Sequence, residues 1–434
     1  MKLRPFELAL VIIFGGLALL AMVLLVGYNP PDDDEGPQVT GTLQVWGTLP
    51  EQPMYDLFRE LTDAYPVFTR VAYTYFPPDE FDEAFINALA DRQQPDMLLV
   101  SHERLVEHRS KLYPIPYENF SLRDYRNMFV DGAELFALSD GIYAFPVAID
   151  PLMMYWNRDI HSTFSYLEPP ATWEELVSEY APTLTKRDDL RRIERSTVAM
   201  GTFNNIANPV ATLSMLIIQG GSLLVSETDG DYTIRLAEAP NTRENPLQSA
   251  LRFYTRFGDP TNPLYSWNRS RPNDRDAFIA EELALYFGFG SEATDIEELN
   301  PNLNFDIAEV PQGATASVRR TYGRYYGFAL VRTAPNLSAA SQIRSTLVSG
   351  SIGKQIADAY GMAPAQRETL AAGDDGTYGR LIYESAPISR GWLNPDMDEA
   401  EDIFRDGVAD INANRAAPTR VSSDITRLLY DEYF

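Results

Sequence analysis

The chain has 434 residues, of which 45% are hydrophobic, so it is long enough to bury the cores of two or three domains. It contains no cysteine, which excludes disulfides, thiolate metal sites, a cysteine nucleophile and a lipid-bearing cysteine. The formal charge of −26 argues against nucleic acid as a partner, because a face that binds phosphates needs an excess of lysine and arginine.

An apolar run, Leu8–Tyr28, follows the basic residues Lys2 and Arg4 at the N-terminus. About 20 residues in a helix span the hydrocarbon layer of a membrane, which is roughly 30 Å thick. No small-residue cleavage site is evident after the run, which favours an uncleaved single-pass anchor over a long signal peptide. We therefore expect residues 1–28 to be a cytoplasmic start and transmembrane helix, and residues 29–40 an acidic, proline-rich linker. The rest of the chain is then extracytoplasmic.

Strand and helix patterns alternate after the linker. Thr42–Trp46, Phe68–Tyr75 and Asp96–Ser101 have the apolar order of strands, and apolar residues at helical spacing separate them. This β-α-β-α-β order predicts a parallel sheet with helices on both faces. Ligands gather at the carboxyl ends of such strands, which is where Trp46 and Ser101–Arg104 lie.

Gly141–Asp159 contains two apolar runs that are separated by Asp150–Pro151. Because proline cannot donate a ladder hydrogen bond, we expect two strands in different sheets, joined by a short crossing at this pair. The crossing is a candidate hinge between two lobes, with the Asp150 carboxylate in a cleft. A second crossing is expected at Phe305–Val310, which alternates in polarity and ends at Pro311.

Helix signals follow the first crossing. Thr172 and Glu175 have the spacing of a capping box, Pro209 opens a helix, and Asn245 caps another. A strand is expected at Leu283–Phe287, and the last hundred or so residues are expected to be mainly helical.

Taken together, these segments resemble the family 1 extracellular solute-binding proteins of ABC importers, the group that contains the maltodextrin-binding proteins. The resemblance covers about residues 40–434 and rests on five segments in order: Thr42–Trp46 (TLQVW), Pro95–Leu105 (PDMLLVSHERL), Asp140–Ile160 (DGIYAFPVAIDPLMMYWNRDI), Pro169–Leu176 (PPATWEEL) and Asp276–Gly290 (DAFIAEELALYFGFG). It implies an α/β fold of the type II periplasmic-binding-protein kind, in which two lobes close on a solute about hinge crossings.

The same resemblance implies the bounds of the lobes. Residues 41–148 and 311–356 would form the N-terminal lobe, and residues 149–310 and 357–434 the C-terminal lobe.

Polar solute-binding positions are also implied by the resemblance. Glu103 and Arg104 match a pair that grips sugar hydroxyls, and Asp150 matches a carboxylate at the hinge. Asn208 lies in a matching cleft loop. Asn205, in the same loop, offers an amide that could bind a polyol, although asparagine is also ordinary in turns.

Aromatic faces cover the apolar side of sugar rings, and each contact adds on the order of 1 kcal/mol. Phe289 stands near the position at which the family commonly has a tryptophan, and this departure argues against maltodextrin itself. The candidates for such platforms, each of which could equally pack in a core, are Trp46, Trp267, Phe289, Tyr325, Tyr326 and Trp392.

We therefore expect a membrane-tethered binding protein that captures a small solute, an oligosaccharide by resemblance, and delivers it to an ABC permease. No cofactor, metal or nucleic acid is expected. An enzyme is not expected either, because HExxH, Walker A and G-x-S-x-G motifs are absent, and the S-x-x-K at Ser351–Lys354 has no K-T-G partner. Two alternatives stay open, a surface-anchored binding or assembly protein of the same fold without transport, and an anchored glycan hydrolase.

Overall fold

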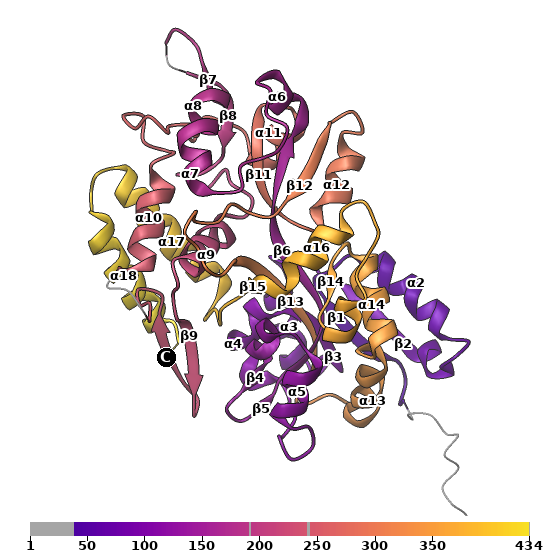
Figure 1. Cartoon of the computed structure of the whole chain (residues 1–434). Coiled ribbons are helices and arrows are strands. Elements are labelled where there is room, and N and C mark those ends of the chain that lie inside the picture. Colours follow the sequence, from indigo (N-terminus) through magenta and orange to yellow (C-terminus); the bar gives the residue numbers. More distant parts are fainter. Residues whose placement is uncertain (1–38, 191, 241–243, 434) are drawn as a thin grey trace, which may run out of the picture.

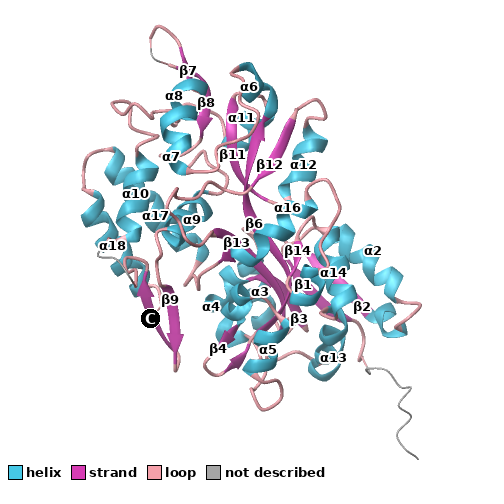
Figure 2. Cartoon of the chain, in the orientation of Figure 1, coloured by secondary structure: helices cyan, strands magenta, loops and turns pink. Residues whose placement is uncertain are grey.

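The computed structural model describes residues 39–190, 192–240 and 244–433 (Figure 1). No helix within these ranges is both long and apolar enough to cross a membrane. The predicted anchor lies outside them, so the transmembrane helix stays a prediction. The helices and strands form two bodies, which we call lobe 1 and lobe 2 (Figure 2).

Lobe 1 is built on the strands β1 (Leu43–Gly47), β2 (Val71–Tyr75) and β3 (Met97–Ser101). The strands are parallel and lie in the order β2-β1-β3. Helices α2 (Glu51–Leu61) and α3 (Phe81–Ala90) connect them, and each buries one apolar face. The predicted β-α-β-α-β unit is confirmed.

The stretch that the sequence divides at Pro151 is one continuous strand, β6 (Ala144–Asn157). The prediction of two strands in different sheets is therefore wrong. Up to Pro151, β6 pairs with β13 (Thr321–Leu330), and after it β6 pairs with β11 (Leu283–Phe289). The missing N–H of proline is tolerated because one ladder ends and the next begins at this residue.

The return to lobe 1 is made by β13 and not by the predicted crossing at residues 305–310. Phe305–Ala308 forms β12, which pairs with the second half of β6 and stays in lobe 2. After a loop, β13 pairs antiparallel with both β6 and β3. Two neighbouring strands, β6 and β13, therefore run between the lobes (Figure 1).

In lobe 2, β11 lies between β6 and β8 (Ile193–Val198). The capping box is confirmed at α7 (Trp173–Glu175), where the Glu175 N–H donates to the Thr172 hydroxyl and the Thr172 N–H donates to the Glu175 carboxylate. The main helices of this lobe are α9 (Pro209–Gln219), α10 (Pro246–Thr255), α11 (Asp274–Ile279) and α12 (Glu292–Leu299).

A hairpin from lobe 2, which we call the arm, reaches lobe 1. It consists of β9 (Leu224–Thr228) and β10 (Asp231–Arg235), and both turn residues, Asp229 and Gly230, have positive φ, as tight hairpin turns require. Figure 1 shows β9 beside lobe 1.

The C-terminal part of the chain passes between the lobes once more. In lobe 1, α14 (Gly350–Ala359) packs on β6, and β14 (Ala363–Pro364) pairs with it, while β15 (Ser389–Arg390) pairs with β13. Then α17 (Met397–Asn412) and α18 (Pro418–Asp431) pack on α10 in lobe 2.

The predicted residue bounds of the lobes stay a prediction. The remaining helices and strands are α4 (Leu105–His108), α5 (Leu122–Met128), α6 (Arg158–Thr163), α8 (Ala181–Leu184), α13 (Leu337–Leu347), α15 (Arg367–Ala371), α16 (Gly379–Ser385), β4 (Ala137–Leu138), β5 (Gly141–Ile142) and β7 (Lys186–Arg187).

Candidate functional site

Polar and aromatic side chains meet where β6 and β13 pass between the lobes. We call this group the crossing cluster, and its members are Glu103, Asp150, Phe289, Ser291, Tyr322 and Arg324. Glu103 follows the carboxyl end of β3 in lobe 1, and Phe289 ends β11 in lobe 2. Asp150 and Arg324 are paired directly across β6 and β13, so their side chains share one face of the sheet. The cluster therefore combines residues of both lobes with residues of the crossing strands.

An ion pair joins Glu103 to Arg324, with 2.8 Å between Oε2 and Nε. The Tyr322 hydroxyl donates to the other carboxylate oxygen at 2.5 Å. Burial disfavours the ionised form of both side chains, but each is stabilised more strongly by the opposite charge of its partner. The pKa of Glu103 is therefore lowered and the pKa of Arg324 is raised. Both side chains are therefore ionised at neutral pH.

Arg324 also covers the ring of Phe289, with 4.1 Å from the guanidinium carbon to the ring centroid. This is the geometry of a cation–π contact. Because Glu103 belongs to lobe 1 and Phe289 to lobe 2, one side chain touches both lobes.

Asp150 accepts two hydrogen bonds from Ser291, from the N–H at 3.0 Å and from the hydroxyl at 2.6 Å. Burial nevertheless raises the pKa of Asp150 to about 7. Its charged and neutral forms are therefore both populated near neutral pH.

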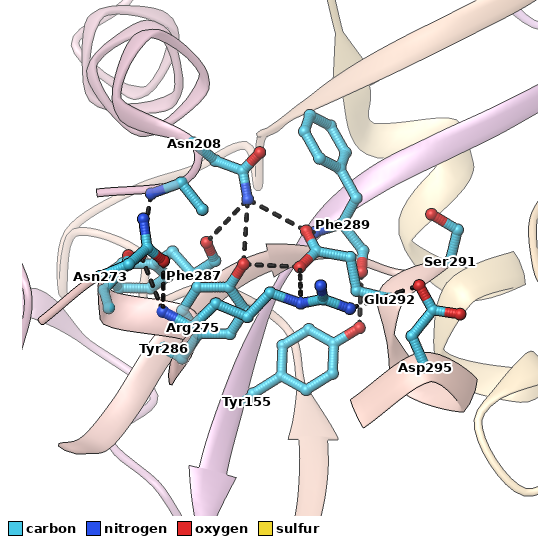
Figure 3. Close-up of polar contacts among 12 residues, drawn as sticks. Tyr155, Asn208, Asn273, Arg275, Tyr286, Phe287, Phe289, Ser291, Glu292 and Asp295 are labelled. Atoms are coloured by element: carbon cyan, nitrogen blue, oxygen red, sulfur yellow. Dashed lines mark hydrogen bonds and ion pairs between the residues drawn. The ribbon is translucent and has the colours of Figure 1, made fainter. Parts of the chain in front are cut away.

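A network in lobe 2 holds the end of β11 in place (Figure 3). Glu292, at the start of α12, accepts hydrogen bonds from the Phe289 N–H at 2.8 Å and from the Asn208 amide at 3.0 Å. Its other oxygen accepts from the Tyr286 hydroxyl at 2.6 Å, and the Tyr155 hydroxyl donates to the Phe289 carbonyl at 2.5 Å. The backbone around Phe289 is thus fixed on both sides, which positions the ring under Arg324.

Arg104, predicted beside Glu103 as a sugar-binding residue, is buried and pairs with Asp82, and its contact with a solute stays a prediction. Asp82 also contacts His108, at 2.6 Å from Nε2, and within the described residues these two and Glu107 form a group with the spacing of metal ligands. The guanidinium of Arg104 already supplies the positive charge at Asp82. The charge of Asp82 is therefore balanced without a metal ion.

Four of the predicted aromatic platforms are buried to 2% exposure or less, namely Trp267, Phe289, Tyr325 and Trp392. Trp392 donates from Nε1 to the Ser214 hydroxyl at 3.0 Å, and Tyr325 donates to the Ser389 carbonyl at 2.8 Å. These contacts give Trp392 and Tyr325 a structural role, and contact of the buried rings with a solute stays a prediction.

Trp46 is half-buried at the end of β1 and packs on Phe76, with 4.5 Å between the ring centroids. The Asn205 amide is bound to its own surroundings, because it donates to the carbonyls of Asn268 at 2.9 Å and Arg271 at 3.1 Å. Of the ten predicted site residues, the structure brings Glu103, Asp150 and Phe289 together, and Asn208 supports them from behind.

Sequence reasoning missed Arg324 and Ser291. Arg324 lies in β13, the strand that returns to lobe 1, whereas that return was expected at residues 305–310. One signal in the sequence could have revealed Arg324. In a strand, alternate residues share one face, so this face carries Tyr322, Arg324 and Tyr326, a single charge between two aromatic side chains.

A second group of polar side chains joins the lobes through the arm. We call it the arm cluster, and its members are Arg109, Ser139, Asp140, Tyr143, Glu227 and Tyr232. Glu227 of the arm accepts from the Ser139 N–H at 2.8 Å and hydroxyl at 2.6 Å, and lies 3.2 Å from the Arg109 guanidinium. Arg109 also donates to the Tyr232 hydroxyl at 3.1 Å and pairs with Asp140 at 2.9 Å.

A cavity of about 450 Å³ lies beside the arm cluster, between Leu138 of lobe 1 and Val225 of the arm. Arg390 and Glu227 reach it, but both are already engaged by protein groups. The predicted solute-binding residues do not line this cavity.

Comparison with known proteins places this geometry in context. Residues 57–377 match the model of a family described as bacterial extracellular solute-binding protein. A relative in Brucella abortus (strain 2308), named as a binding protein, is 20% identical over 340 residues, which are 76% of this chain and 77% of the relative.

Solved structures share the fold at low sequence identity. A cyclo/maltodextrin-binding protein complexed with maltotetraose has a TM-score of 0.71 and 16% identity, over 91% of this chain and 98% of that protein. The maltose-binding periplasmic protein of Listeria monocytogenes, in complex with maltose, has a TM-score of 0.69 and 14% identity, over 90% and 97%. The two-lobed α/β periplasmic-binding-protein-like fold is confirmed. The matched family and these neighbours are binding proteins and not enzymes, in agreement with the prediction from sequence.

Proposed function

The chain belongs to the bacterial extracellular solute-binding protein family, and from this premise we propose that it captures an oligosaccharide between its lobes and delivers it to an ABC permease. The observation that carries the proposal is the crossing cluster. It gathers ionised, hydroxyl and aromatic groups of both lobes on the two strands that connect them, so one solute there would contact both lobes.

The chemistry of the cluster supports a solute rich in hydroxyl groups. A hydroxyl both donates and accepts hydrogen bonds, and the cluster offers acceptors in the Asp150 carboxylate and the Ser291 hydroxyl oxygen, and donors in Arg324. The solved neighbours include proteins complexed with maltotetraose and with maltose, which supports a carbohydrate as the solute here.

The proposed mechanism is rotation of the two lobes about β6 and β13. A solute that makes more contacts in the closed arrangement shifts the population toward that arrangement by its differential affinity. The arm cluster lies away from Asp150 and Arg324, where β6 and β13 pass between the lobes, so the same rotation alters its contacts.

We further propose that the apolar run at residues 8–28 tethers the protein to the cell membrane, with the lobes outside. Its length and the basic residues before it support a single-pass anchor. A tether would keep the binding protein near its permease, and the acidic linker would separate the lobes from the membrane.

One observation favours a second candidate, a surface-anchored binding or assembly protein without a transport role. Glu103 and Phe289, both expected to contact sugar, are engaged by Arg324. A protein of this kind would carry the fold while lacking a free solute site.

A melting screen of the full chain separates the two candidates. The chain is purified in a detergent without a sugar headgroup, so that the detergent cannot compete, and is heated with glycans, amino acids, polyamines or oxyanions. A ligand at about a hundred times its Kd stabilises the folded state by about 2.7 kcal/mol, which raises Tm by about 2 °C or more. A shift with one class of glycan supports capture of that glycan and argues against a protein that lacks a free solute site, whereas no shift with any glycan would overturn the carbohydrate proposal.

A further inference from the structure

Arg324 is the charged group of the crossing cluster with the most open surface. Its side chain is 29% exposed, against 8% for that of Glu103. Asp150 and Phe289 are each only 2% exposed. A solute that approaches the cluster therefore meets the guanidinium before it meets the carboxylates or the ring.

The orientation of Arg324 is fixed from three sides. Glu103 holds Nε, the ring of Phe289 lies under the guanidinium plane, and β13 fixes the backbone. The outer edge of the guanidinium, with Nη1 and Nη2, makes no ion pair with a carboxylate of the described chain, although the Arg324 side chain also hydrogen-bonds to Tyr326. A planar donor edge that is held in this way matches two neighbouring oxygen atoms.

The electrostatics of the cluster allow such a contact. The Glu103–Arg324 pair is neutral overall, so the donors of Arg324 are polarised without a large net positive charge. Asp150, whose neutral form is populated near neutral pH, limits the repulsion of an incoming anion. Both a vicinal diol and a carboxylate on a sugar fit this edge.

We propose that Arg324 is a solute-binding and specificity-determining residue, whose outer edge donates to two neighbouring oxygen atoms of the solute. This inference rests on the proposed function. It assigns to Arg324 a contact with the solute that was expected from aromatic side chains such as Phe289. At this position the guanidinium, rather than the Phe289 ring, faces the solute. Since Glu103 and Phe289 hold Arg324 from different lobes, its contact with solute couples binding to the arrangement of the lobes.

The test begins with the full chain and two glycan series, neutral α-glucans and oligogalacturonates, which separate a diol from a carboxylate as the bound group. Arg324→Lys keeps the charge and can still pair with Glu103, but it lacks the planar fork. We expect Arg324→Lys to weaken binding of the preferred series at least about tenfold while Tm without solute stays close to wild type. Arg319→Lys is the matched control, because Arg319 is 59% exposed and pairs with Glu309 in the loop before β13.

A second measurement needs no substitution. Phenylglyoxal modifies accessible arginines, and bound solute should protect Arg324 at least about fivefold while Arg319 reacts at an unchanged rate. The inference is overturned if a glycan binds, Arg324→Lys binds it like wild type and Arg324 stays reactive. That result would leave the proposed function standing. If wild type binds no glycan, the proposed function fails and this inference fails with it.

Discussion

Two of the contacts between the lobes, the crossing cluster and the arm cluster, are built in different ways. The crossing cluster sits on β6 and β13, whose backbones continue from one lobe into the other. The arm cluster instead joins a hairpin of lobe 2 to separate segments of lobe 1, through hydrogen bonds and ion pairs.

This difference assigns a separate task to each contact. A rotation about β6 and β13 moves nearby groups little and distant groups more, so the crossing cluster persists while the arm cluster is strained or broken. The crossing cluster is therefore suited to binding a solute, and the arm cluster to setting the relative stability of lobe arrangements. Four predictions test the comparison, from the largest expected effect to the smallest.

The largest effect is expected from Glu103→Gln in the crossing cluster. Removing this carboxylate leaves the Arg324 cation, which is mostly covered by protein, without its partner. Breaking a buried pair on one side costs about 4 kcal/mol of unfolding free energy, because the remaining charge stays desolvated. Chemical denaturation measures the loss. The control is Glu309→Gln, which removes the partner of the exposed Arg319 and should cost less than about 1 kcal/mol. Equal losses in the two variants would show that the crossing pair is not buried in solution.

Asp150 should make stability fall as pH rises. Its folded pKa of about 7 lies above the unfolded value of 3.8, so the folded state binds more protons between these values. The stabilisation is complete below the unfolded pKa and is lost as pH rises through about 7. We expect Asp150→Asn to remove this slope, a change on the order of 3 kcal/mol between about pH 4 and pH 8.

The measurement is the difference between the unfolding free energies of wild type and Asp150→Asn at each pH. Asp274, whose pKa burial also raises to about 7, is present in both proteins and cancels in the difference. A difference that does not vary with pH would contradict the burial of the Asp150 carboxyl.

The arm cluster should show the opposite pH dependence and a smaller effect. Burial opposes ionisation of Glu227, but hydrogen bonds from Ser139 and Gly230 and the charge of Arg109 outweigh it, so its pKa is lowered. Its stabilisation is present above the unfolded pKa of 4.5 and is lost as pH falls through the folded value.

A double-mutant cycle of Arg109→Met and Glu227→Gln should give a coupling of about 1 kcal/mol at neutral pH and almost none at about pH 3. The two side chains are 16% and 2% exposed, so solvent screens this pair only partly. The exposed pair Arg427–Asp431 is the control, with an expected coupling below about 0.5 kcal/mol. Coupling that persists in acid would mean that Glu227 is not the titrating group.

Much of lobe 1 could be predicted from the sequence, because alternating or continuous apolar runs separated by helical spacing leave few other arrangements. The continuity of β6 could not. Pro151 signals a break in the sequence. The strand continues because β6 pairs with β13 before this residue and with β11 after it, and this change of partner is seen only in the structure.

Part of the candidate site could be predicted, because some of its residues lie at strand ends or crossings that the sequence reveals. Glu103 follows a recognisable strand and Asp150 lies at the expected crossing, and the family resemblance implies solute-binding positions at both. Arg324 depends on which strand returns from lobe 2, and that strand was assigned to residues 305–310. Burial of Trp267 and Trp392 depends on contacts with distant parts of the chain, which composition and spacing do not encode.

The smallest effect is expected in the population of lobe arrangements. The chain has no cysteine, so Thr228→Cys on the arm and Arg123→Cys on α5 would be its only thiols, and spin labels there report the distance between arm and lobe 1. Arg109→Met in this background removes about 1 kcal/mol from the arm contact, which is about a fivefold change in the equilibrium between arrangements. We expect electron paramagnetic resonance to show a broader distance distribution for Arg109→Met without solute, and Arg427→Met to leave the distribution unchanged.

Saturating solute should narrow the distribution again in Arg109→Met, because solute bound at the crossing cluster favours one arrangement whether or not the arm is attached. If the distance distribution is the same in Arg109→Met as in the parent protein, β6 and β13 alone determine how the lobes are arranged, and the arm contact does not affect that arrangement.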